Sequence, residues 1–359
     1  MDSTTMNTTC SNDYCVSFAD VQAAATRIAG SAHITPVMTS ISLNRAAGNR
    51  NVFFKVEALQ KTGSFKFRGA LNAVKCVQQQ LQEATVTIAD NDNSSATLSF
   101  VTHSSGNHAQ ALALAAVLAG STATIVMPDT APAVKRDAVA DFGAKIVLVP
   151  AAERASTAQR IQRETGATFI HPSEDPRVIA GQGTVSLEMI NQVKEINNGT
   201  PLDAVIIPVG GGGLASGNIT TLRAMYGRNV KIVLAEPAAL DDAKRSFQAG
   251  KLLGHEPDNP LDSVADGLKT TLGPHTWPIV RDGADAILTV EEVDILRATK
   301  LIWERLKICI EPSAGVGVAV LLSQEFQTKF ANCRNVVVIL CGGNVDIVDM
   351  VTKMKVAGL

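Results

Sequence analysis

A lysine at the start of a predicted helix is the residue that most clearly could do chemistry. Residues 61–70 read KTGSFKFRGA, where a Gly-Ser turn precedes apolar residues at helical spacing. A helix N-terminus favours acidic side chains, yet this one carries Lys61, Lys66 and Arg68. Desolvation and the two neighbouring cations would lower the pKa of Lys66, and a neutral lysine amine attacks carbonyl groups. A solvated surface lysine is the alternative.

A glycine-rich turn supplies a second chemical feature, a binding loop for an anion. Four consecutive glycines lie between an apolar run and a helical pattern: Gly210, Gly211, Gly212 and Gly213. Backbone N–H groups in such a turn converge on an anion, and the helix dipole adds to the attraction, so a phosphate is predicted. Gly210, Gly212 and Ala215 also fit a dinucleotide fingerprint, with Glu236 lying 236 − 210 = 26 residues on. A plain structural turn remains a third interpretation.

Three apolar runs end in turns of this kind: FVTHSSGNHAQ, VIIPVGGGGLASG and VVILCGGN. Because ligands of open α/β sheets bind beyond the carboxyl ends of the strands, the three turns predict one shared site. An aldehyde cofactor with a phosphate group would use both the lysine and the glycine turn.

The elements that must position these residues follow from the apolar pattern. Seven strands are predicted, at 51–57, 98–103, 122–128, 145–150, 204–209, 231–236 and 335–340. Near-continuous apolar strands that alternate with Ala-rich helical segments indicate an α/β fold with a parallel sheet buried on both faces. The polar stretch 85–97 is predicted to be a surface loop.

Composition excludes several classes of function. The chain has 359 residues, 46% of them hydrophobic, with a net charge of −2 and 4% aromatic residues, which argues against nucleic acid or a membrane as partner. Its six cysteines show neither CxxC pairs nor metal-site spacing, so reduced thiols in a cytoplasmic protein are predicted. The opening residues lack a basic or apolar segment and are interpreted as a disordered tail.

The motifs together resemble a known family. QKTGSFKFRGALNAV, THSSGNHAQAL, PVGGGGLASG, ADGLKTTLG, WERLKICIEPSAGVGVAV and CGGNVD look like the fold-type II pyridoxal phosphate (PLP) enzymes, in particular the serine racemases and the related serine and threonine dehydratases. The likeness runs from about Ser17 to about Asp346. It implies two open, twisted, mostly parallel sheets flanked by helices, in a homodimer. A large PLP-binding domain (18–98 and 177–359) would hold an inserted small domain (99–176), after a tail at 1–17.

The resemblance also implies the cofactor contacts. Lys66 would be the Schiff-base lysine, with Phe65 beside it, and Gly210 to Gly213 the phosphate cup. Asn107 would lie beside the 3-hydroxyl of PLP. Cys341 stands where the racemases usually have serine, and it would face the pyridine nitrogen, to which a neutral thiol gives no proton. This substitution favours elimination.

Racemisation of serine is the activity that the resemblance implies. Lys66 would act on one face of the α-carbon and Ser105 on the other, while Ser104, Asn107 and His108 hold the substrate carboxylate. Elimination of serine to pyruvate and ammonia is expected beside it. Because dehydratases of 3-hydroxyaspartate also carry Ser105, an ammonia-lyase acting on serine, threonine or hydroxyaspartate is the alternative. A nicotinamide-dependent oxidoreductase is a more distant one.

Two accessory sites are also implied. Glu236, the carbonyl of Leu240 and Asp242 match a divalent-cation site, and such oxygen ligands suit Mg²⁺ or Ca²⁺. A nucleotide-effector site for ATP, found at the dimer interface of some members, is matched by four residues: Lys61, Gln110, Lys307 and Asn344. Phe142 replaces a tyrosine of that site, which argues against activation by ATP.

Overall fold

Two separate sheets organise the chain in the computed structural model, which describes residues 14–87, 97–131 and 133–359. The larger sheet has six strands in the order β1-β2-β10-β7-β8-β9, and the smaller has four in the order β5-β4-β3-β6. Within these sheets, only the β1–β2 pair is antiparallel. The predicted α/β fold with two mostly parallel sheets is confirmed.

The large-sheet strands read as apolar runs because helices cover both faces. Strands β7 (Ala204–Pro208) and β10 (Asn335–Leu340) are buried along their whole length. The other strands of this sheet are β1 (Val37–Met38), β2 (Asn51–Val56), β8 (Lys231–Pro237) and β9 (Ala286–Val290). The small sheet consists of β3 (Ser99–His103), β4 (Thr122–Pro128), β5 (Lys145–Val149) and β6 (Thr168–Phe169). The seven predicted strands are present; β1, β6 and β9 were not predicted.

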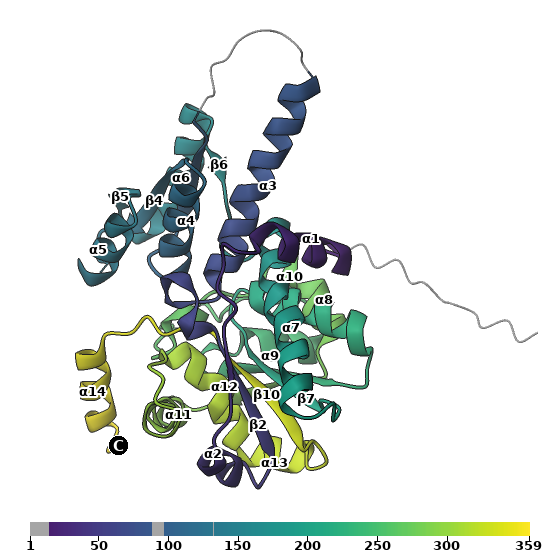
Figure 1. Cartoon of the computed structure of the whole chain (residues 1–359). Coiled ribbons are helices and arrows are strands. Elements are labelled where there is room, and N and C mark those ends of the chain that lie inside the picture. The colour runs from purple at the N-terminus through teal and green to yellow at the C-terminus, as the bar shows by residue number, and fades with distance from the viewer. Residues whose placement is uncertain (1–13, 88–96, 132) are drawn as a thin grey trace, which may run out of the picture.

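Helices separate into the layers seen in Figure 1. One side of the large sheet carries α1 (Phe18–Ile28), α7 (Pro176–Ile196), α8 (Gly213–Tyr226) and α10 (Thr276–Gly283). The other carries α11 (Glu292–Arg305), α12 (Pro312–Leu322) and α13 (Gln324–Lys329). Shorter or peripheral helices are α2 (Ile41–Ala46), α9 (Asp242–Ala249) and α14 (Ile347–Val356).

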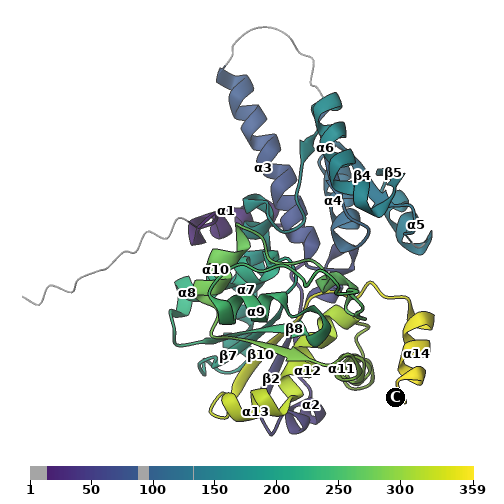
Figure 2. The same cartoon turned by 180° about the vertical axis from the view of Figure 1, so that it is seen from behind.

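The small sheet is flanked by α4 (Asn107–Leu118), α5 (Ala133–Asp141) and α6 (Arg154–Thr165). The long α3 (Lys66–Thr87) begins next to the part of the chain that contains the large sheet. It then continues alongside α4, as both views show (Figures 1 and 2). Phe67, Leu71 and Val74 of α3 share one apolar core with Leu112 and Ala116 of α4. The lysine that begins α3 therefore lies where the two sheets meet.

Two predicted boundaries are corrected. The tail predicted for residues 1–17 must end before Tyr14, because Val16 is in the core, Tyr14 donates a hydrogen bond to Asp282, and Ser17 forms a capping box with Asp20. The rest of that predicted tail, 1–13, lies outside the described residues. Helix α3 extends to Thr87, so the loop predicted at 85–97 starts later; 88–96 also lies outside the described residues. No helix in the described ranges is long and apolar enough to cross a bilayer.

Candidate active site

Lys66 is half-buried at the first position of α3. Its Nζ donates a hydrogen bond to the carbonyl of Pro172 at 2.8 Å and lies 5.2 Å from the ring centre of Phe65. Desolvation lowers the pKa of Lys66 to about 8, against the opposing attraction of Cys341 and Glu311. Roughly a tenth of the side chains are therefore neutral at pH 7, compared with fewer than about one in a thousand for an ordinary lysine.

The neighbouring cations do not cause this shift, which corrects the sequence-based expectation. Arg68 is buried and donates to Glu57 at 2.8 Å and to Glu188 at 3.0 Å, so its charge is neutralised. Lys61 lies over the ring of Phe67 at 5.9 Å. The three cations at the start of α3 thus have three different environments, and burial lowers the pKa of Lys66.

The buried ion pair of Arg68 predicts a stability effect. Glu57→Ala would leave the guanidinium with one of its two carboxylate partners, Glu188, and breaking a buried pair costs about 3–5 kcal/mol of the free energy of unfolding. Glu164→Ala is the matched control, because the pair of Glu164 with Arg160 is exposed and worth under about 1 kcal/mol. Urea denaturation of both variants checks this; equal losses would contradict the predicted role of the buried pair.

The glycine turn joins β7 to α8 and leaves a wall free of side chains. Gly212 has φ of +79°, which disfavours any other residue. A Cβ at Gly211 would lie 2.6 Å from the Oγ of Ser173, and one at Gly212 would lie 2.7 Å from the Cβ of Thr276. Since Gly212 also has no side chain with which to cap α8, the first N–H groups of that helix are available to an anion.

Residues 172 and 173 bring the lysine and the glycine turn into one site. Pro172 accepts the hydrogen bond from Lys66, and Ser173 packs on Gly211 and Gly213. The prediction that these two features lie together is therefore correct. Ser173 was missed, because HPSEDP contains no motif that distinguishes its serine from an ordinary helix-start residue.

The turn after β10 forms a second wall, beside the start of α3. The carbonyl of Cys341 accepts a hydrogen bond from the amide of Phe65 at 3.1 Å, which fixes this turn against the start of α3. The thiol of Cys341 is buried, and burial together with Glu311 raises its pKa well above the ordinary value. It is consequently a neutral thiol, as expected.

A buried carboxyl group that sequence reasoning missed adjoins this wall. Asn107 donates to both oxygens of Glu311, at 2.9 and 3.2 Å. Burial, followed by repulsion from Asp266, raises the pKa of Glu311 to about 8. The sequence did hold a signal for this residue. Glu311 is the single acid in the apolar run KICIEPSAGVGVAVLL, and an acid is rarely buried unless it is paired.

The remaining predicted substrate residues lie in the turn between β3 and α4. Ser104 and Ser105 are half-buried, and the Oγ of Ser104 accepts from the amide of Gly106 at 3.3 Å. The ring of His108 is buried, with Nε2 3.3 Å from the carbonyl of Ile170. Burial, then the charge of Lys66, lowers the pKa of His108 well below its ordinary value, so the ring is neutral. Their roles toward substrate stay predictions.

Comparisons with known proteins agree with this geometry. The family model described as "Pyridoxal-phosphate dependent enzyme" matches residues 28–342. The chain belongs to this family. It is 46% identical to serine racemase from Homo sapiens, over 96% of both sequences, and 41% identical to serine racemase from Arabidopsis thaliana, over 95% of this chain and 97% of that one.

Solved structures give the same family fold. Serine racemase from Dictyostelium discoideum matches with a TM-score of 0.81 and 40% identity, over 93% of this chain and 100% of that one. Maize serine racemase matches with a TM-score of 0.84 and 39% identity, over 95% and 98%. The threonine deaminase of T.th. matches with a TM-score of 0.80 and 38% identity, over 92% and 99%. The fold-type II PLP resemblance is confirmed.

The site fits the cofactor of this family. A lysine of lowered basicity, a side-chain-free turn at a helix N-terminus and a neutral thiol match the aldehyde, phosphate and ring of PLP. Just before Lys66 in the chain, the buried hydroxyl oxygens of Thr62 and Ser64 have no hydrogen-bond partner among the described residues. The dinucleotide alternative is disfavoured, because the side chain of Glu236 is buried and its oxygens accept the amides of Ala243 and Lys244 in α9, so it is not exposed to a ribose hydroxyl.

The glycine cup predicts a loss of PLP affinity in Gly212→Ala. A methyl group there meets Leu272 and Thr276 at under 3 Å on left-handed backbone, a strain of about 1–3 kcal/mol, or roughly 10- to 100-fold in Kd. Gly166→Ala is the control, because Gly166 has φ of +70° but open space around its Cα. Titration with PLP of the two variants, both as apoenzymes, compares their affinities. Equal affinities would contradict the prediction that the glycine turn binds the phosphate of PLP.

The predicted cation residues come together at the end of β8. Glu236 ends the strand, Leu240 lies in the short turn Ala238–Leu240, and Asp242 starts α9. Both carboxylates are buried. Burial, then Asp242, raises the pKa of Glu236 well above its ordinary value, and burial raises that of Asp242 to about 6. A buried pair of this kind is stabilised by a cation.

The residues predicted to bind a nucleotide differ in burial and in their contacts. Asn344 donates to the Oδ1 of Asn107, the residue predicted to lie beside PLP. Gln110 is buried in α4, whereas Lys307 is exposed and donates to the carbonyl of Glu304. An effector role for this set, together with Lys61, stays a prediction.

Proposed function

We propose that this chain is a PLP-dependent racemase that interconverts L- and D-serine and also eliminates serine to pyruvate and ammonia. The observation that carries the proposal is Lys66, a partly neutral amine held beside a phosphate-binding cup. The 40–46% identity to serine racemases over nearly the whole chain supports the choice of substrate and reaction.

PLP, when bound, supplies a conjugated ring that spreads the negative charge left when the α-proton departs. The protein supplies everything else. Lys66 anchors the cofactor and moves a proton at its Nζ on one face of the α-carbon. The Oγ of Ser105 would hold or give a proton on the other face. The N–H groups at the start of α4, from Asn107 and His108, would bind the substrate carboxylate.

One observation favours a larger share of elimination. The neutral thiol of Cys341 would face the ring nitrogen of PLP without protonating it, which would limit how far charge is withdrawn from the α-carbon. Negative charge that stays on the α-carbon of serine would readily expel the hydroxyl group from the neighbouring β-carbon. An ammonia-lyase acting on serine, threonine or 3-hydroxyaspartate is therefore the second candidate function.

A divalent cation, Mg²⁺ or Ca²⁺, is proposed between Glu236, the carbonyl of Leu240 and Asp242. Asp242 also accepts the amide of Leu272 at 3.3 Å, and the side chain of Leu272 packs on Gly212 of the cup. Removing the cation is thus expected to loosen the phosphate site. Activation by ATP is not part of the proposal, because Phe142 lacks the tyrosine hydroxyl.

The chain is further proposed to work as a homodimer in the cytoplasm. Ile34 and Ile41 are 78% and 74% exposed, and burying such apolar side chains against a second copy of the chain would favour association. The five described cysteines are free thiols, which suits a reducing compartment.

Incubation of the PLP-loaded enzyme with L-serine, with D-serine and pyruvate measured together, tests the proposed reaction. Both products are expected. Pyruvate without D-serine would support the ammonia-lyase instead, and neither product would contradict both functions.

A further inference from the structure

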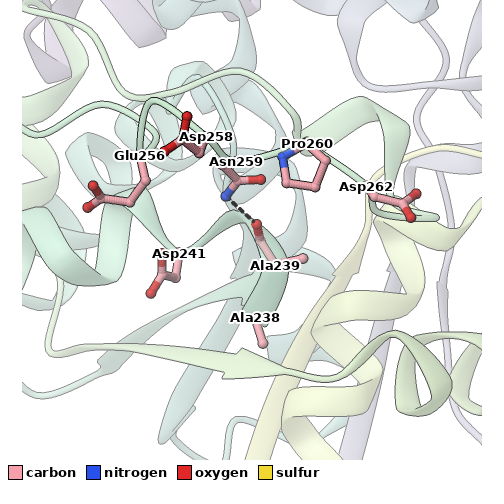
Figure 3. A pocket seen from close by; sticks show the side chains of 8 residues that line it. All are labelled: Ala238, Ala239, Asp241, Glu256, Asp258, Asn259, Pro260 and Asp262. Atoms are coloured by element: carbon pink, nitrogen blue, oxygen red, sulfur yellow. Dashed lines mark hydrogen bonds between the residues drawn. The ribbon is translucent and has the colours of Figure 1, made fainter.

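An open groove of about 480 Å³ is lined in part by the turn after β8, and Figure 3 shows the acidic side chains around it: Asp241, Glu256, Asp258 and Asp262. Neither Lys66 nor the glycine turn is among its lining residues. This hollow is therefore separate from the cofactor site, whose walls are joined by direct contacts instead.

A histidine fixes the turn through which these contacts are made. His171 follows β6, and its Nδ1 accepts the amides of Ser173 at 3.2 Å and of Glu174 at 2.9 Å. Because an amide nitrogen only donates, Nδ1 carries no hydrogen, and the hydrogen of the neutral ring lies on Nε2. One ring nitrogen thus sets the backbone path of the residues that follow it.

The turn held in this way, 172–174, contacts both the lysine and the glycine cup. The carbonyl of Pro172 accepts a hydrogen bond from Nζ of Lys66 at 2.8 Å. The Oγ of Ser173 would lie 2.6 Å from a Cβ at Gly211, so the serine packs closely on the cup. A shift of the turn would therefore displace the amine and the cup relative to each other.

The third residue of the turn reaches the far side of the cup. The carboxylate of Glu174 accepts the amide of His275 and the hydroxyl group of Thr276, each at 2.8 Å. The Cβ of Thr276 would in turn lie 2.7 Å from a Cβ at Gly212. Glu174 consequently connects the turn to the start of α10, which closes this side of the glycine cup.

The ring of His171 is held in the form that these contacts need. Burial, followed by repulsion from His103 and Lys66, lowers the pKa of His171 to about 4, so the ring is neutral at pH 7. The ring also packs edge-on against His103 and Phe169, with centres 5.8 and 6.1 Å away. A hydrogen on Nδ1 would face two amide hydrogens and break both bonds.

We propose that His171 is a positioning residue for PLP, because its Nδ1 fixes the turn 172–174 and thereby sets Lys66 against the glycine cup. It acts through the turn rather than by binding the cofactor. This inference rests on the PLP site proposed above. It adds a requirement to that site, namely a hydrogen-bond acceptor at the δ position of residue 171.

Two substitutions of His171 separate the acceptor from the ring. His171→Asn removes the ring but keeps an oxygen at the δ position, from which asparagine commonly accepts backbone amides a few residues ahead. His171→Gln removes the same ring and places its oxygen one bond further out. Because both variants lose the packing on His103 and Phe169, a difference between them reports the hydrogen bonds.

Titration of the apoenzymes with PLP compares the variants. His171→Gln is expected to weaken PLP binding by at least about tenfold, and His171→Asn by less than about threefold. His33→Gln, which changes an exposed ring, should bind PLP like the unmodified protein. Equal weakening in both His171 variants would assign the effect to ring packing and overturn the proposal, as would unchanged affinity in both.

Nuclear magnetic resonance of the full chain labelled with ¹⁵N-histidine needs no altered residue in the protein measured. It reports which ring nitrogen carries the hydrogen, and the signal that is missing from either variant is that of His171. At neutral pH the hydrogen is expected on Nε2, and a hydrogen on Nδ1 would overturn the proposal. Since this measurement uses no PLP, it fails or succeeds independently of the cofactor assignment, which the L-serine assay tests.

Discussion

Replacement of Lys66 by alanine is expected to lower both the racemisation and the elimination of serine by about 10³-fold or more. The reason is that one amine both anchors PLP and moves the α-proton, and loss of a general base alone costs 10²- to 10⁴-fold. Lys66 is also the described lysine whose burial brings its pKa to about 8. Production of D-serine and pyruvate, each under saturating PLP, is the measurement.

Lys75→Ala is the matched control for this variant. Lys75 lies on the same helix and donates to the carbonyl of Arg27 and to Ser31, away from the site. It should keep nearly full activity. If Lys66→Ala retained more than about a tenth of the original rate, the amine would not be the base on either face.

Ser105→Ala is expected to separate the two reactions. Without the hydroxyl, the face opposite Lys66 lacks its proton donor, so D-serine formation should fall by about 10²- to 10⁴-fold. Pyruvate formation should persist, because elimination needs the α-proton removed from one face only. In D₂O, L-serine should still acquire deuterium at its α-carbon without inversion, which distinguishes lost inversion from lost binding.

Ser121→Ala, just beyond the other end of α4, serves as its control, since the Oγ of Ser121 donates to the nearby carbonyl of Ala119. Both activities should survive there. Equal loss of D-serine and pyruvate in Ser105→Ala would mean that Ser105 merely positions substrate or caps the helix.

Much of the fold could be read from the sequence because parallel strands buried on both faces are apolar along their length. Two of the three missed strands show the limit of that pattern. Strands β1 (Val37–Met38) and β6 (Thr168–Phe169) have only two residues each and gain their order from neighbouring strands. Tertiary pairing of this kind leaves no periodic signal.

The site could be predicted where consecutive glycines, or cations at a helix N-terminus, stand out in the sequence. Lys66 and the glycine turn have these features, and in the structure Lys66 contacts Pro172 while the adjacent Ser173 packs on the glycine turn. Glu311 and Ser173 act through contacts made between distant segments, so their types alone do not single them out. The expectation that Lys61 and Arg68 depress the pKa of Lys66 failed because sequence does not reveal that Glu57 and Glu188 neutralise Arg68.

The central claim is that the amine of Lys66 forms a covalent link to the aldehyde of PLP. Borohydride reduction of the PLP-loaded protein followed by peptide mass spectrometry tests it most directly. A pyridoxyl group is expected on Lys66, in the peptide that contains Ser64 and Phe65. A reduced protein that carries the group on a different lysine, or on none, would contradict the claim.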